Sequence, residues 1–235
     1  MDIQLEPCII LHCQPYRETS LFVDLFGLHS GRVRVVAKGV RRGKSPLAYV
    51  LRPFNRVVAS WKGRGDLPNL IFCESQGDPV GLRGTSLYSA FYLSELLVYL
   101  LPRQDPVPDL FEFYWETLIA LSKTSAAEPL LRYFELTLLE ILGYGVELDR
   151  DAEGDPIDFN QAYQYHFEAG FVQAHFESPG AVRGSTLQSL YLRNLEDPSE
   201  VKEARVLMRY LIQYHLKGRE LKSRALFKPI VRETL

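Results

Sequence analysis

Basic residues are the side chains of this sequence best suited to chemistry, because ten of them share one segment without any acid. The segment runs from Leu25 to Gly65 and contains Arg32, Arg34, Lys38, Arg41, Arg42, Lys44, Arg52, Arg56, Lys62 and Arg64. Average usage would place about five acids in a segment of this length. Cations neutralise phosphates, so the pattern predicts binding of a polyanion rather than cleavage of a bond.

The glycine-containing run from Lys38 to Ser45 invites comparison with a nucleotide-binding loop. A P-loop requires four residues between its glycines, whereas Gly39 and Gly43 enclose three. Pro46 also disfavours helical backbone at Ser45, where a P-loop needs a helix to begin. We favour a flexible basic loop whose backbone approaches a phosphate chain; a merely solvated hairpin tip is the alternative.

Catalytic and metal-binding patterns are not evident in the sequence. The histidines form no His-Glu-x-x-His motif, no Gly-x-Ser-x-Gly turn is present, and the three cysteines include no Cys-x-x-Cys pair. The acidic run from Glu147 to Asp158 lacks the spaced glycine and closing glutamate of an EF-hand, which favours a solvated turn. We therefore expect a protein that is not an enzyme, with no cofactor and no metal.

The formal net charge of −2 conceals an uneven distribution of charge. Residues 1–80 carry eleven basic against seven acidic residues, residues 81–200 seven against nineteen, and residues 201–235 nine against three. The N-terminus shows no apolar signal segment, and the longest apolar run, Leu96–Leu101, is too short for a membrane span. We expect a cytoplasmic protein that does not contact a membrane.

The elements that position the basic residues change character near residue 80. Residues 1–80 predict a barrel of five short strands, of which the oligonucleotide-binding (OB) fold is the leading candidate. Arg32 and Arg34 share one strand face, and Arg52 and Arg56 lie on the next extended run. Among the aromatic residues, Tyr49, Phe54 and Trp61 could stack on bases or belong to the core, and Phe22 and Phe26 are assigned to the core. The strands are expected at 8–12, 21–28, 32–37, 56–61 and 70–73.

Residues 81–235 predict a helical domain, so the fold class is α+β with two domains. Helical periodicity favours helices that begin near Leu82, Pro108, Pro129, Thr186 and Glu200, with a short one at 223–228. An irregular insertion, residues 145–180, contains a predicted hairpin around Glu168–Gly170. Lys202, Arg205 and Arg209 share one face of the last long helix. This face is either a second contact for nucleic acid or an ordinary solvated helix surface.

Five blocks, in order along nearly the whole chain, together resemble the RecO family of bacterial DNA repair proteins. They are Tyr16–Leu21, Gly31–Val33 running into Val36–Arg42, Leu51–Phe54, Leu131–Leu136 with Leu142–Gly145, and Gly218–Arg224. The resemblance implies an OB barrel, a helical domain and a recombination mediator without catalytic turnover, associated with the nucleoid. It implies binding of single- and double-stranded DNA, annealing of complementary strands and, with RecR, loading of RecA onto DNA coated with single-strand-binding protein.

The resemblance also assigns roles to particular residues. The basic barrel surface of the family corresponds to Arg32, Arg34, Lys38, Arg41, Arg42, Lys44 and Arg52, to which the charge pattern adds Arg56. Arg132 corresponds to a position expected to contact the acidic tail of single-strand-binding protein; an ordinary ion pair on a helix surface is the alternative. A rival function is a protein-interaction adaptor with incidental DNA binding.

One departure from the family concerns zinc. Many relatives carry four cysteines after the Leu-Gly-Tyr-Gly block, whereas Glu147–Gly180 contains none. Zinc requires four nitrogen or sulfur ligands, and His166 and His175 supply two at most. The insertion is therefore expected to bind no metal and to be held by its own apolar residues, Ile157, Phe159, Tyr163, Tyr165, Phe167, Phe171 and Phe176.

Overall fold

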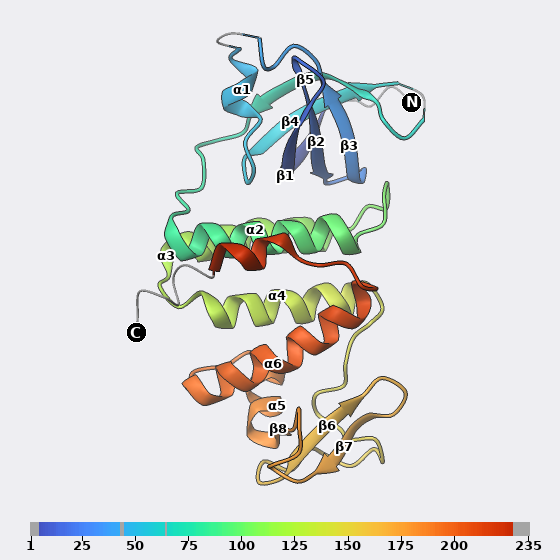
Figure 1. Ribbon diagram of the computed structural model, residues 1–235, viewed down its shortest axis with the longest axis vertical. Helices are drawn as coiled ribbons and strands as arrows, with labels where there is room; N and C mark the ends of the chain where they lie inside the picture. Colours follow the sequence, from blue (N-terminus) through green and yellow to red (C-terminus); the bar gives the residue numbers. More distant parts are fainter. Residues whose placement is uncertain (1–4, 43–44, 64, 228–235) are drawn as a thin grey trace. The chain divides into compact units, whose positions relative to one another are not determined.

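The computed structural model describes residues 5–42, 45–63 and 65–227 (Figure 1). Its contacts divide the chain into two compact units. The first unit contains the chain up to Ser125 and the segment from Leu221 onward, and the second is Ala126–Glu220. The sequence-based boundary between residues 80 and 81 stays a prediction. Within the described ranges, no helix is long and apolar enough to cross a bilayer.

A closed five-stranded barrel of the OB type forms the N-terminal part of the first unit, as predicted. The strand order is β1-β2-β3-β5-β4, and β4 closes the barrel by pairing with β1. Apolar side chains that alternate along the strands fill the interior, among them Val23, Val35 and Trp61. The strands are β1 (Glu6–Tyr16), β2 (Ser20–Gly27), β3 (Gly31–Ala37), β4 (Arg56–Lys62) and β5 (Asn69–Ser75).

Besides the one-turn helix α1 (Leu47–Val50) between β3 and β4, the described part of the first unit contains three helical elements. They are α2 (Gly84–Leu100), α3 (Pro108–Lys123) and the 3-10 helix η1 (Lys222–Phe227), which runs beside α2 (Figure 1). The outward face of the barrel packs on the two long helices, where Phe26 meets Phe111 and Phe54 meets Phe91, both edge to face. One face of the barrel is therefore buried within the unit.

The second unit consists of helices and a small sheet. Its helices are α4 (Ala127–Ile141), α5 (Gly184–Tyr191) and α6 (Pro198–His215), and its strands β6 (Ala162–His166), β7 (Gly170–Ala174) and β8 (Val182–Arg183) form a sheet of order β7-β6-β8. α6 begins at Pro198, two residues before the predicted start near Glu200. The Asp197 carboxylate accepts a hydrogen bond of 2.7 Å from the Ser199 amide, and Pro198 occupies the first turn.

Two elements differ from the sequence-based prediction. A one-turn helix, α1 (Leu47–Val50), follows the basic loop, although Pro46 argues against a helix at Ser45. Pro46 occupies the N-cap, outside the first helical residue, where its missing N–H costs nothing. The strand β8 is only two residues long and carries no periodic pattern that the sequence could reveal.

Several aromatic assignments also need correction. Phe22 is only half-buried because it stacks on Tyr16 outside the core, whereas Phe26 is buried as expected. In the insertion, Phe159 and Phe176 are exposed, so they do not belong to its interior. Their neighbours in the chain are turn residues, which place both rings at the surface. The interior of the insertion is formed by Ile157, Tyr163 and Phe171.

Candidate nucleic-acid interface

The arginines of β3 lie on its outward face and meet a buried carboxylate of the neighbouring strand. β2 pairs with β3 so that Asp24 stands opposite Arg34. Arg34 donates two parallel hydrogen bonds to Asp24, from Nε to Oδ1 at 2.9 Å and from Nη2 to Oδ2 at 2.8 Å. Asp24 is 1% exposed. The partly exposed Arg34 is therefore held in a bidentate ion pair with a buried carboxylate.

Arg32 is engaged in the same region. Its Nε donates to the carbonyl oxygen of Leu101 at 3.1 Å, and its Nη1 lies 4.0 Å from Oδ1 of Asp24. The absence of acids from the segment itself therefore does not leave these two arginines without an acidic neighbour. Asp24 is the residue immediately before the acid-free segment. The pairing of β2 with β3 places it opposite Arg34, which lies within that segment.

The electrostatics of Asp24 reflect these contacts. Burial by itself would raise the pKa of the carboxyl, but hydrogen bonds and charge from His12 and Arg34 outweigh burial, so the pKa lies below its ordinary value. Arg34 also lines a cavity of about 370 Å³ together with Phe91 of α2 and Lys222 of η1. The arginine face of β3 therefore looks into the first unit.

Arg56 at the start of β4 has a counterion on a helix. Its two terminal nitrogens donate to the Glu112 carboxylate of α3 at 3.0 and 3.2 Å. The guanidinium also lies 5.4 Å from the ring centre of Phe111 and 5.6 Å from that of Trp115. Local charge counting missed this pair because Glu112 is 56 residues away in the sequence.

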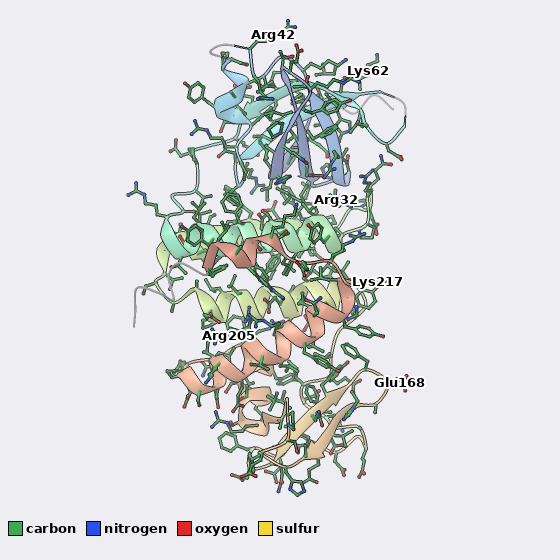
Figure 2. All side chains as sticks on the ribbon, in the orientation of Figure 1. Arg32, Arg42, Lys62, Glu168, Arg205 and Lys217 are labelled. Atoms are coloured by element: carbon green, nitrogen blue, oxygen red, sulfur yellow. The ribbon has the colours of Figure 1, made fainter. Side chains whose placement is uncertain are left out.

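The cations of the loop after β3 are different, because they are exposed. Lys38, Arg41 and Arg42 follow the end of the strand, and the backbone turns at Gly39, whose φ is +71°. Figure 2 shows Arg42 at one end of the barrel and Arg32 at the other, next to α2. Glycine adopts this left-handed backbone without strain, so it allows the reversal that gathers the three cations.

A groove of about 660 Å³ lies beside this loop. Lys38, Gly39 and Arg42 form one side, and the turn between β1 and β2 forms the other with Tyr16 and Arg17. The two sides are joined at Arg41, whose amide donates to the Thr19 carbonyl at 3.0 Å and whose Nη1 donates to the Arg17 carbonyl at 3.2 Å. Glu18 is the acid that lines the groove. We call this feature the loop groove.

Aromatic rings accompany the exposed cations. Tyr16 stacks on Phe22 with ring centres 3.9 Å apart, and the Arg17 guanidinium lies 5.0 Å from the Tyr16 ring centre. Arg52, also exposed, lies 5.2 Å from the ring centre of Tyr49. Of the other stacking candidates, Phe54 is buried against Phe91 of α2 and Trp61 is buried in the barrel interior.

Tyr16 and Arg17 line the loop groove but were not among the predicted residues, because the acid-free segment that identified the others begins at Leu25. Their position in a turn between two predicted strands was the signal available. Lys44 lies outside the described residues. The DNA-binding role of the eight candidates, engaged or exposed, stays a prediction.

Arg132 occupies α4 of the second unit and is 5% exposed. Its Nη2 donates to Oε1 of Glu135 at 2.5 Å, and its Nη1 lies 3.8 Å from Oε2 of Glu128. Glu135 is itself buried. The guanidinium therefore belongs to an ion pair inside the helix packing, and its role toward a partner peptide stays a prediction.

Within the described ranges, no three His, Cys, Asp or Glu side chains are grouped so that they could hold a metal ion. In the acidic loop, Oδ1 of Asp151 accepts hydrogen bonds of 3.0 Å from the amides of Glu153 and Asp155. This carboxylate stabilises a turn of its own backbone.

Two family profiles together match almost the entire chain. The profile described as "Recombination protein O N terminal" matches residues 1–77, and "Recombination protein O C terminal" matches residues 82–225. The chain is 46% identical over 227 residues to the DNA repair protein RecO of Methylococcus capsulatus, covering 96% of this chain and 93% of the relative. For that of Nitrosococcus oceani the identity is 43% over 235 residues, with 99% and 96% covered. For that of Pseudomonas aeruginosa it is 44% over 218 residues, with 93% and 92% covered.

Proposed function

This chain belongs to the RecO family of DNA repair proteins, and from this premise we propose that it is a recombination mediator that binds single- and double-stranded DNA. It brings complementary strands together and lets them anneal, in the cytoplasm and at the nucleoid. The proposed action is non-covalent and asks no residue to break a bond, in keeping with relatives whose names indicate no enzymatic activity.

The loop groove is the single observation that carries this proposal. OB barrels bind oligonucleotides at the loops between β1 and β2 and between β4 and β5, and the loop groove includes the first of these loops. Exposed cations line it or stand beside it, at Arg17, Lys38, Arg41 and Arg42. Phosphates that enter the groove exchange their counterions for these side chains.

Annealing follows from charge neutralisation. Two strands repel each other through their phosphates, and a strand whose phosphates are partly neutralised approaches its complement at lower cost. Base pairing supplies the sequence selectivity, so the protein need not contact base edges. The acidic middle of the chain limits the overall attraction for DNA, which favours release after pairing.

The test is annealing of complementary oligonucleotides by the full chain and by a Lys38→Ala/Arg41→Ala/Arg42→Ala variant. We expect the variant to anneal slowly, with salt reducing the wild-type rate more than the variant rate. The control is Arg83→Ala/Arg103→Ala/Lys123→Ala, which removes the same charge from exposed positions on and near the helices. Equal annealing by the two variants would refute the loop groove as the DNA site.

The partners RecR, single-strand-binding protein and, indirectly, RecA are part of the same proposal and rest on the family. Arg132 is the residue proposed for the acidic tail of single-strand-binding protein. A tail carboxylate would have to share this guanidinium with Glu128 or Glu135, so binding should be weak and salt-sensitive. Tail-peptide affinity of Arg132→Ala and Arg132→Lys, each compared at a measured melting temperature, tests this role.

A second function, a protein-interaction adaptor, is favoured by one observation. Three of the barrel's arginines, Arg32, Arg34 and Arg56, are engaged by groups of the protein itself. If the loop-groove variant annealed strands at the wild-type rate but Arg132→Ala lost peptide binding, the adaptor would be the better description. Strands precoated with single-strand-binding protein, with and without its tail, separate the two functions.

A further inference from the structure

The exposed face of α6 combines aromatic rings with basic side chains. Val206, Tyr210 and Tyr214 follow one another at intervals of four residues and are all exposed, the two tyrosines by 51% and 58%. A second row runs beside the first and contains Arg205, Arg209 and Gln213. Steps of four residues place successive members about 6 Å apart along the axis. Lys217 is exposed and lies in the turn just after the helix, two residues beyond its last residue. We call these two rows, together with Lys217, the α6 face.

The rings of the α6 face are fixed by the turn of the β6–β7 hairpin. Phe167 stacks on Tyr214 with ring centres 3.7 Å apart and planes 17° apart, and it lies 5.2 Å from Tyr210. At the end of the helix, His215 stacks on Tyr144 with ring centres 4.2 Å apart. The tyrosines are thus held in place while more than half of their surface remains open, so they are preorganised for a further flat ring.

The charge around these rings is positive. The chain contains no acid from Ala204 to Arg219. Arg205 pairs with Glu128 of α4 at 3.2 Å. Arg209 and Lys217 form no ion pair with any residue that the structure describes. Figure 2 labels Arg205, Lys217 and, at the hairpin turn beside Phe167, Glu168. Glu168 follows Phe167 in the hairpin turn, and Glu128 is already paired with Arg205. Within the described residues, Arg209 and Lys217 are therefore available to a ligand.

We propose that the α6 face is a second nucleic-acid site, which binds the bases of a single strand. Unpaired bases stack on Tyr210 and Tyr214, and the adjoining phosphates meet Arg209 and Lys217. A duplex cannot use this site in the same way, because its base faces are stacked inside the helix. The loop groove binds backbone charge, so it accepts single and double strands, whereas the α6 face distinguishes them.

Charge complementarity selects this occupant. A hydrophobic protein partner would leave Arg209 and Lys217 beside an apolar surface without a counterion, whereas a single strand supplies a flat ring and a phosphate at every nucleotide. A role limited to fastening the hairpin requires contact between Phe167 and Tyr214 but gives no reason for a neighbouring row of cations. The experiment below also distinguishes these two alternatives, a hydrophobic protein partner and a purely structural role in holding the hairpin.

The experiment measures affinity of the full chain for fluorescent oligo(dT) and for a duplex of equal length, by anisotropy over a range of salt. We expect Tyr210→Ala/Tyr214→Ala to weaken oligo(dT) binding at least about fivefold and to leave duplex binding unchanged. Tyr191→Ala, which removes a ring of similar exposure from α5, is the control and should change neither. Arg209→Ala/Lys217→Ala should flatten the salt slope by about 0.7 per phosphate contact.

A background that lacks the cations of the loop groove separates this site from the proposed function. Lys38→Ala/Arg41→Ala/Arg42→Ala should retain binding of oligo(dT) that the tyrosine substitutions then abolish. No residual binding in that background, or equal losses for oligo(dT) and duplex, would overturn the proposal whether or not the loop groove binds DNA. Unchanged oligo(dT) binding by the tyrosine variant at normal melting temperature would also overturn it; loss of a protein partner in that case would assign the face to that partner.

Discussion

The two basic regions of the barrel look alike in sequence and differ in the structure. The strand arginines, Arg32 and Arg34 of β3 and Arg56 of β4, are held by Asp24, by the Leu101 carbonyl and by Glu112. The loop cations, Lys38, Arg41 and Arg42, are exposed, and so is Arg52 after α1. The first group fastens strands to each other and to the helices, and the second is available to a ligand.

The difference teaches that a local excess of basic residues is no measure of free positive charge. Strand pairing places residues opposite one another that are ten positions apart, as at Asp24 and Arg34, and helix packing adds acids from more than fifty positions away, as at Glu112. Turn residues have no neighbouring strand, so their side chains meet water. The same residue type therefore stabilises the fold in one place and is free to bind phosphate in another.

Removal of the Asp24 carboxylate should have the largest effect on stability of the substitutions that test this difference. Asp24→Asn leaves the guanidinium of Arg34 partly buried without its counterion, so we expect the free energy of unfolding to fall by about 2–3 kcal/mol. Urea denaturation followed by circular dichroism measures this change. Glu112→Gln, which removes a carboxylate that is half exposed, is the control and should cost less. Equal losses would mean that burial of Asp24 is unimportant.

The loop cations should produce the opposite result. Lys38→Ala/Arg41→Ala/Arg42→Ala should leave the free energy of unfolding within about 0.5 kcal/mol of wild type, since these side chains are exposed. The log–log salt slope of single-strand affinity should flatten by up to about 2, because each phosphate that is no longer neutralised accounts for about 0.7. A salt titration of DNA binding checks this; an unchanged slope would mean that the loop cations do not meet phosphate.

Lowering the pH should weaken the stabilisation by the strand arginines, because their partner Asp24 becomes protonated, whereas the loop cations should be unaffected. The pKa of Asp24 is lower in the folded protein than in the unfolded chain. Its contribution to stability is therefore complete above the unfolded value, about 3.9, and is lost as the pH falls through the lower folded pKa. Unfolding measured from pH 6 downward should show a decline that Asp24→Asn reduces. An identical acid dependence in the variant would assign the decline to other carboxyls.

The smallest effect is expected at Arg56. Its pair with Glu112 is partly exposed, so Arg56→Ala should lower the free energy of unfolding by about 1 kcal/mol, including the loss of packing against Phe111 and Trp115. The salt slope of DNA binding should not change. A flatter salt slope without loss of stability would show that Arg56 binds phosphate, as the loop cations are expected to do, and does not stabilise the fold as the other strand arginines do.

Much of the fold could be predicted because its signals are local. Short apolar runs between turn residues identified the five strands, and helical periodicity identified the long helices, of which α3 begins at the predicted Pro108. The hairpin around Glu168–Gly170 was found from its turn residues. The helix α1 and the strand β8 escaped because each is too short for a period to be visible.

The site could be predicted only in part, because exposure and partners are not local. Phe159 and Phe176 have the residue type of a core, yet they lie at the surface. Arg17 has no distinctive neighbours in sequence, yet it borders the loop groove because the β1–β2 turn folds beside the loop after β3. Phe167 and Tyr214 are 47 positions apart and meet only when the hairpin packs on α6.

The sequence by itself determined a five-stranded barrel, a set of helices, the family and the segments in which positive charge is concentrated. Those features depend on periodicity, turn residues and composition, which act over a few residues. Only the tertiary structure decided which cations are free, because a counterion is supplied by strand register and helix packing. Asp24 shows this most simply: it lies one residue outside the acid-free segment in the sequence and opposite that segment's Arg34 in the folded barrel.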